Sequence, residues 1–173
     1  MTGEDLKKIF KNIMLSLFAI AAITGFACMF TPDYMGYKQV IKTLIQYACI
    51  LVMGAGFLFL GVAMFGKMKD RAYVPVLLIL FGIGGVLMGM TTCFNGIRGL
   101  QAGPVEADGG NYYVTSSNSF RGRDKYYLHA EHLNSVKKLA IDKRTYNYIE
   151  NSGSDVVITY YPYVNIADEV ICK

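Results

Sequence analysis

The residues with the clearest ligand chemistry are His129, Glu131 and His132, which lie within four positions of one another. Imidazole and carboxylate groups are common zinc ligands in proteins. On an extended strand, however, His129 and Glu131 share one face while His132 points to the other. Coordination by all three would need a bulge or a turn, so we predict neither a metal site nor any other cofactor.

Groups that could carry out acid, base or nucleophilic catalysis are sparse. Asp168 and Glu169 would point apart on a strand, and we expect both to be solvated. No Ser, His and Asp set forms a recognised local motif. We therefore predict a protein that is not an enzyme, and a membrane-bound hydrolase ranks last among its candidate functions.

The four cysteines show neither the paired spacing of a zinc site nor the density of a disulfide scaffold. They are Cys28, Cys49, Cys93 and Cys172. Cys28, Cys49 and Cys93 have two possible roles. Two of them could form a disulfide on an oxidising side of the membrane, or all three could pack as small apolar side chains. Packing is the favoured one.

The segment 116–124 holds the candidate interaction residues Phe120, Arg121 and Arg123. Two arginines around a glycine can present paired donors to a carboxylate or a phosphate, and Phe120 would add an apolar contact. The alternative is an ordinary solvated hairpin loop, because surface loops are usually polar whether or not they bind a ligand.

Three stretches without any charged residue precede this part of the chain, at 12–32, 43–66 and 72–97. Each is longer than the roughly 20 residues that a helix needs to cross the bilayer. The first could instead be a signal peptide, but its apolar run exceeds the usual core of about 7 to 15 residues. The pattern predicts three transmembrane helices.

The basic residues near the helix ends predict an orientation. One side would hold Lys7, Lys8, Lys11, Lys67, Lys69 and Arg71, and the other Lys38, Lys42 and Arg98. This asymmetry favours a cytoplasmic amino terminus, and three crossings then place the carboxyl-terminal domain outside the cytoplasm. The segment 98–173 holds nine basic and nine acidic residues, so the net charge of +4 comes from the helix flanks. We accordingly predict no nucleic-acid partner.

Small residues in the second and third spans are candidates for helix packing, because helices in lipid associate through close backbone approach. These candidates are Gly54, Gly56, Gly61, Gly85 and Gly89. They could pack within one three-helix bundle, or form a face for dimerisation or for a larger partner. The spans contain no ionisable side chain other than cysteine and tyrosine, which disfavours a proton-coupled transporter acting alone.

Beyond position 100 the pattern changes to short runs rich in tyrosine, valine and isoleucine, which is typical of strands. We predict strands near 111–116, 125–132, 136–141, 155–161 and 166–171, with Asp142 capping a helical turn. The chain would thus comprise a transmembrane domain, 1–100, and a β-rich domain, 101–173. We expect a small antiparallel β-domain, either an oligonucleotide-binding or SH3-like barrel or a sandwich.

The run from Gly153 to Pro162 resembles a known ending of small sheet domains in bacterial membrane proteins. That ending reads Gly-Asp-x-Val-x-Val-x-Tyr-x-Pro, and it occurs in uncharacterised multi-pass proteins. Here Ser154 separates the glycine from the aspartate. The resemblance implies an accessory membrane protein and assigns no catalytic or binding residue.

These features predict a non-enzymatic, multi-pass protein of the cell membrane. Its β-domain would contact a partner protein, the cell envelope or another copy of the chain, and its helices would contact the lipid bilayer. The alternative is a small accessory subunit of a membrane transport or export complex, in which the glycine faces dock on larger subunits.

Overall fold

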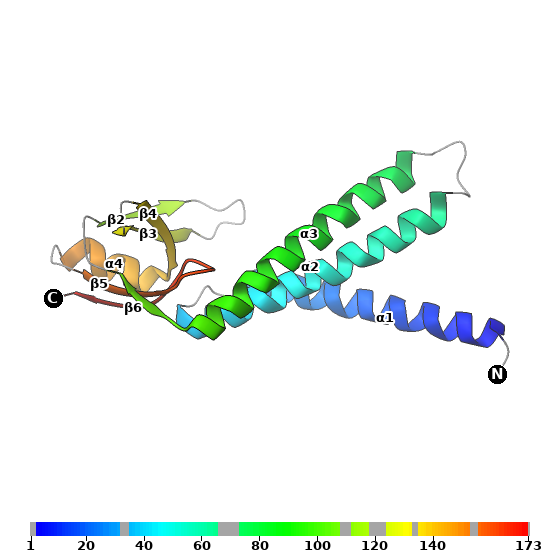
Figure 1. Ribbon diagram of the computed structural model, residues 1–173, viewed down its shortest axis with the longest axis horizontal. Coiled ribbons are helices and arrows are strands. Elements are labelled where there is room, and N and C mark those ends of the chain that lie inside the picture. Colours follow the sequence, from blue (N-terminus) through cyan, green and yellow to red (C-terminus); the bar gives the residue numbers. More distant parts are fainter. Residues whose placement is uncertain are drawn as a thin grey trace. The chain divides into compact units, whose positions relative to one another are not determined.

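The computed structural model describes residues 3–31, 35–65, 73–107, 112–117, 124–132, 135–152 and 156–172. Its elements run in the order of three long helices and then a sheet interrupted by one short helix (Figure 1). The long helices are α1 (Gly3–Phe30), α2 (Gly36–Phe65) and α3 (Tyr73–Ala102). All three contain segments long and apolar enough to cross a membrane, which confirms the prediction of three candidate spans.

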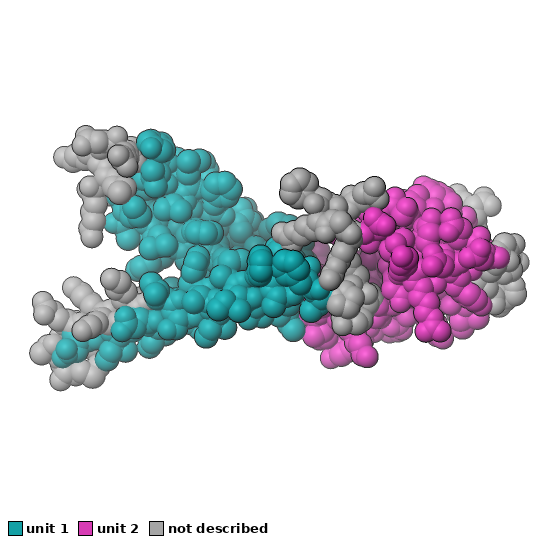
Figure 2. All heavy atoms as spheres, turned by 180° about the vertical axis from the view of Figure 1, so that it is seen from behind, with its two compact units in different colours: residues 1–31, 44–94 teal, residues 32–43, 95–173 magenta. Residues whose placement is uncertain are grey.

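The chain divides into two compact units, drawn in different colours in Figure 2. Unit 1 comprises residues 1–31 and 44–94, which are the greater part of the long helices. Unit 2 comprises residues 32–43 and 95–173. The first turns of α2 and the last turns of α3 therefore belong to the same compact unit as the sheet.

Within unit 1, glycines bring the backbones of α2 and α3 into direct contact. A Cβ placed on Gly54 would lie 2.7 Å from the backbone nitrogen of Val86, and one placed on Gly89 would lie 2.9 Å from the Cα of Leu51. Gly61 meets the backbone of α3 in the same way, and Gly85 lies against Gly54. Gly56 instead faces the ring of Phe18 on α1. Such close approach is what holds helices together where lipid removes the hydrophobic drive.

Unit 2 contains a six-stranded sheet in the order β1-β5-β6-β4-β3-β2. Its strands are β1 (Val105–Ala107), β2 (Tyr112–Ser117), β3 (Lys125–His132), β4 (Ser135–Ile141), β5 (Val156–Tyr161) and β6 (Ile166–Cys172). Five of them lie within two residues of the predicted strands. The sixth, β1, was not predicted, because three residues after Pro104 carry too short a pattern.

The sheet corrects two expectations about the β-domain. It is open, with β1 and β2 as its edges, and is not a closed barrel. It is also mixed, because β4 and β6 are parallel, with Ala140 opposite Ile166, while every other described pair is antiparallel. After β4 the chain passes through α4 (Lys143–Ser152) to the hairpin β5-β6, and the second strand of this hairpin, β6, lies beside β4 and parallel to it.

The core of the β-domain lies between one face of the sheet and α4. Leu128, Leu139, Val156 and Ile158 are fully buried there, and Ile149 of α4 packs among them. The helix begins as predicted, because the backbone N–H of Thr145 donates to Asp142 Oδ1 at 2.7 Å. Burial of these branched side chains drives the sheet and the helix together.

The helix ends within unit 2 are fastened to the sheet. Gly36 begins α2 with a φ of 66°, and a Cβ there would overlap the Asp168 carboxylate. Asp168 is the extra residue of a bulge in β6, between the partners of Thr159 and Tyr160. The first turn of α2 has no acidic residue of its own, so Asp168 places a negative charge at the positive end of that helix. Asp168 is half-buried against this helix end, whereas we expected a solvated side chain.

The end of α3 is closed by a glycine and leads directly into the sheet. Gly103 has a φ of 71°, and its backbone N–H donates to the carbonyl of Gly99 at 3.1 Å. This is a left-handed helix cap, a conformation that glycine adopts at little cost. β1 follows two residues later and pairs with β5. The helix and the sheet are thus joined by a short, hydrogen-bonded connection.

We predict that Gly54→Ala weakens the folded bundle by about 1–3 kcal/mol, because the added methyl meets backbone atoms that cannot move independently. Gly84→Ala is the matched control on α3, since a Cβ there has no neighbour within 4 Å. Its stability should be unchanged or slightly raised. Unfolding by sodium dodecyl sulfate in mixed micelles, followed by circular dichroism, measures both. Equal stability of the two variants would contradict the packing described.

Candidate functional site

The face of the sheet that points away from the core carries aromatic and basic side chains on β2, β3 and β4. Strand register sets them side by side, because Tyr113 pairs with His129, and His129 pairs with Lys138. One step along, Thr115 pairs with Tyr127. Paired residues on neighbouring strands project from the same face. We call Tyr113, Thr115, Tyr127, His129 and Lys138 the outer face.

The imidazole ring of His129 contacts two other residues of the outer face. It stacks on the ring of Tyr113, with centroids 4.4 Å apart and planes inclined by 5°. Its Nε2 is hydrogen-bonded to Oγ1 of Thr115 at 2.9 Å. Burial, and then the positive charge of Lys138, lower the pKa of His129 below its ordinary value of 6.5. At pH 7 the ring is therefore neutral, and it serves as a flat, partly apolar surface.

A cation completes the outer face beside the stacked rings. The Lys138 ammonium lies 3.9 Å from the centroid of the Tyr127 ring, which is cation–π distance. The Lys138 side chain is exposed, and Tyr113 is 55% exposed at the edge strand. The outer face thus presents rings held in place by their neighbours together with a positive charge that water can reach.

This arrangement offers an aromatic surface with one cation beside it. The Nε2 of His129 is engaged by Oγ1 of Thr115. In the part of the chain that the structure describes, no group of three His, Cys, Asp or Glu residues could hold a metal ion. Tyrosine is one of the residue types that carry contact energy at protein interfaces.

The residues predicted from the sequence to form sites are distributed as follows. Phe120, Arg121 and Arg123 lie outside the described residues, as do the side chains of Glu131 and His132. The packing glycines lie in unit 1 and contact other helices of the same chain. Cys28, Cys49 and Cys93 are free thiols, and Cys49 lies against Gly25.

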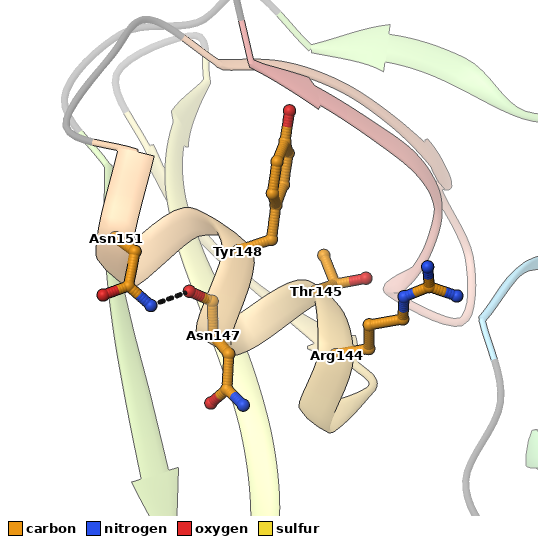
Figure 3. Close-up of a pocket in the computed structure, with 5 residues that line it drawn as sticks. All are labelled: Arg144, Thr145, Asn147, Tyr148 and Asn151. Atoms are coloured by element: carbon orange, nitrogen blue, oxygen red, sulfur yellow. Dashed lines mark hydrogen bonds between the residues drawn. The ribbon is translucent and has the colours of Figure 1, made fainter.

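A second feature, a hollow of about 610 Å³, lies on the exposed side of α4 (Figure 3). Its lining side chains are Arg144, Thr145, Asn147, Tyr148 and Asn151. All five come from one helix, and Figure 3 shows Tyr148 and Asn147 pointing in different directions. Asn151 donates to the carbonyl of Asn147 at 2.6 Å, so its amide is already engaged. Polar groups that converge on a ligand are characteristic of binding pockets, and this hollow lacks them.

No protein family, curated protein or solved structure matches the chain. The outer face could have been anticipated in part, because tyrosine, threonine, histidine and lysine recur at every second position of the predicted strands. What the sequence could not supply was the register that sets His129 between Tyr113 and Lys138. That register depends on turns and pairings beyond any single strand.

We predict that His129 titrates below pH 6.5, and that Lys138→Gln moves its pKa upward by removing the neighbouring charge. The unfolded chain then takes up the proton first as the pH falls below about 6.5, so the stability of the β-domain declines with falling pH until the folded histidine also titrates. Ring-proton NMR in micelles can follow this titration. With 2 histidines in the chain, His129→Gln identifies the signal by its loss. A pKa at or above 6.5 would contradict the burial and contacts assigned to the ring.

Proposed function

We propose that this chain is a non-enzymatic, multi-pass membrane protein whose β-domain binds an acidic segment of a partner protein through the outer face. The three apolar helices hold the domain at a membrane. The open sheet then offers a broad surface to a protein, and the stacked pair Tyr113 and His129 is the observation that carries the proposal.

The stacked pair favours a protein partner for an energetic reason. A tyrosine already packed against its neighbour loses little conformational entropy on binding. More of the free energy gained from its contacts therefore contributes to affinity. Lys138 supplies charge complementarity to a carboxylate. Lys138 is the charged residue among the five that define the outer face, and its positive charge makes an acidic segment the matching chemistry.

The partner is expected outside the cytoplasm. Six Lys and Arg residues lie near the helix ends on the amino-terminal side of the membrane, against three on the other side. Cytoplasmic loops carry the basic excess in membrane proteins. Three crossings then assign the β-domain to the extracytoplasmic side, where an envelope protein or a second copy of the chain could meet it.

The alternative function, an accessory subunit docked through its glycine faces, has less support. Gly54, Gly61 and Gly89 contact α2 or α3 within the chain, so these surfaces are already occupied. Gly84 is the described glycine of the spans whose Cβ position is open. A single open position falls short of the repeated small residues that a docking face needs.

We expect a photoreactive benzoylphenylalanine at Tyr113 to give a discrete protein adduct in native membranes, because that position is exposed and belongs to the outer face. Lys138→Glu should abolish the adduct by reversing the charge. The same photoreactive residue at Tyr148, which is similarly exposed on α4, is the matched control and should give no such product.

Two outcomes of this experiment count against the proposal. Equal adducts from Tyr113 and Tyr148 would indicate non-specific proximity rather than binding by the outer face. An adduct that survives Lys138→Glu would remove the role of charge. Labelling of Tyr113→Cys by an impermeant maleimide only after cell lysis would overturn the sidedness.

A further inference from the structure

The turn between β5 and β6 lies against the last turns of α3. This turn comprises Pro162, Tyr163, Val164 and Asn165. A Cβ on Gly99 would lie 3.9 Å from the Cβ of Tyr163 and 3.5 Å from a methyl of Val164. The guanidinium carbon of Arg98 lies 5.6 Å from the centroid of the Tyr163 ring. All of these residues belong to unit 2.

The position of Arg98 in the chain indicates how deep in a membrane this contact would lie. Arg98 is the first charged residue after the charge-free stretch 72–97. α3 has 30 residues, and a helix of that length extends about 45 Å, against about 30 Å of hydrocarbon. A helix of this length extends beyond the hydrocarbon, and the charge of Arg98 favours the headgroup region for this end. A guanidinium at this point reaches lipid phosphates, as charged side chains at the ends of spans do.

Two tyrosines with exposed rings lie in unit 2, one in the β5–β6 turn and one in the first turn of α2. Tyr163 is 46% exposed although it contacts Arg98, and Tyr37 in the first turn of α2 is 59% exposed. Tyrosine rings favour the boundary between hydrocarbon and water, because their apolar body and polar tip are satisfied there together. Val164 is half-buried beside Tyr163, which adds apolar surface to the turn.

We infer that the β5–β6 turn is a second, independent binding surface of the β-domain, and that its partner is the phospholipid headgroup layer. Tyr163 inserts beside α3, Arg98 pairs with lipid phosphate, and Tyr37 makes the equivalent contact beside α2. We assign the bilayer as the partner because Arg98 and Gly99 belong to α3, the helix that emerges from the bilayer next to this turn. This surface lies apart from the outer face, so it does not depend on the protein partner.

The absence of tryptophan from the chain makes this inference directly testable. Tyr163→Trp introduces a single fluorophore at the turn and preserves an aromatic ring for Arg98. The protein is reconstituted in vesicles whose phospholipids carry bromine near the carbonyl end of the acyl chains. Tyr113→Trp is the control, because its side chain is similarly exposed but lies four strands from β5, about 19 Å across the sheet.

We expect the Tyr163→Trp protein to lose most of its emission to brominated lipid and to resist quenching by aqueous iodide. The Tyr113→Trp protein should show the reverse. Tyr37→Trp is a second probe of the same layer and should behave like Tyr163→Trp. If only the Tyr37→Trp protein is quenched by lipid, or if iodide quenches Tyr163→Trp as strongly as Tyr113→Trp, the turn does not contact the bilayer and the inference is overturned.

Discussion

The packing of the Asp168 carboxylate against Gly36 joins the start of α2 to the sheet. The helix begins at Gly36, whose missing side chain leaves room for that carboxylate. The bulge in β6 turns Asp168 out of the regular ladder and toward the helix. Nearby, the Thr145 hydroxyl donates to the sulfur of Met35, and Met35 packs on the core of the sheet. The chain that enters α2 is thereby built into the β-domain.

The position of Asp168 at the start of α2 also affects the neighbouring Tyr161. Burial, followed by the negative charge of Asp168, raises the pKa of Tyr161, so this hydroxyl stays protonated beside the helix start. On the other side, Gly99 and Gly103 let α3 approach the β5–β6 turn and then enter β1. Two helix ends are held by one sheet. The outer face lies on the other strands of that sheet, β2, β3 and β4.

The sequence predicted the elements well but not their arrangement. The charge-free stretches located the long helices, because a helix is the structure in which one apolar segment satisfies its own backbone hydrogen bonds in lipid. Asp142 marked the start of α4, because helix capping depends only on neighbouring residues. The open order of the strands and the parallel pair of β4 and β6 were missed, since both depend on pairings between distant segments. Asp168 looked like a solvated charge because its partner at Gly36 lies 132 positions away. Tyr113 and Lys138 were likewise unremarkable until the register placed them beside His129.

A disulfide between positions 99 and 163 tests most directly whether the β-domain is fastened to the helix ends. The Cβ positions lie 3.9 Å apart, within the range that a disulfide spans. In a variant with Cys28, Cys49, Cys93 and Cys172 replaced by alanine, Gly99→Cys with Tyr163→Cys should form an intramolecular bond in native membranes under mild oxidation. It would appear as a shift in mobility on non-reducing gels, absent from either single variant. If the pair stays reduced while the protein is inserted and folded, the sheet is not held against α3 and the account is wrong.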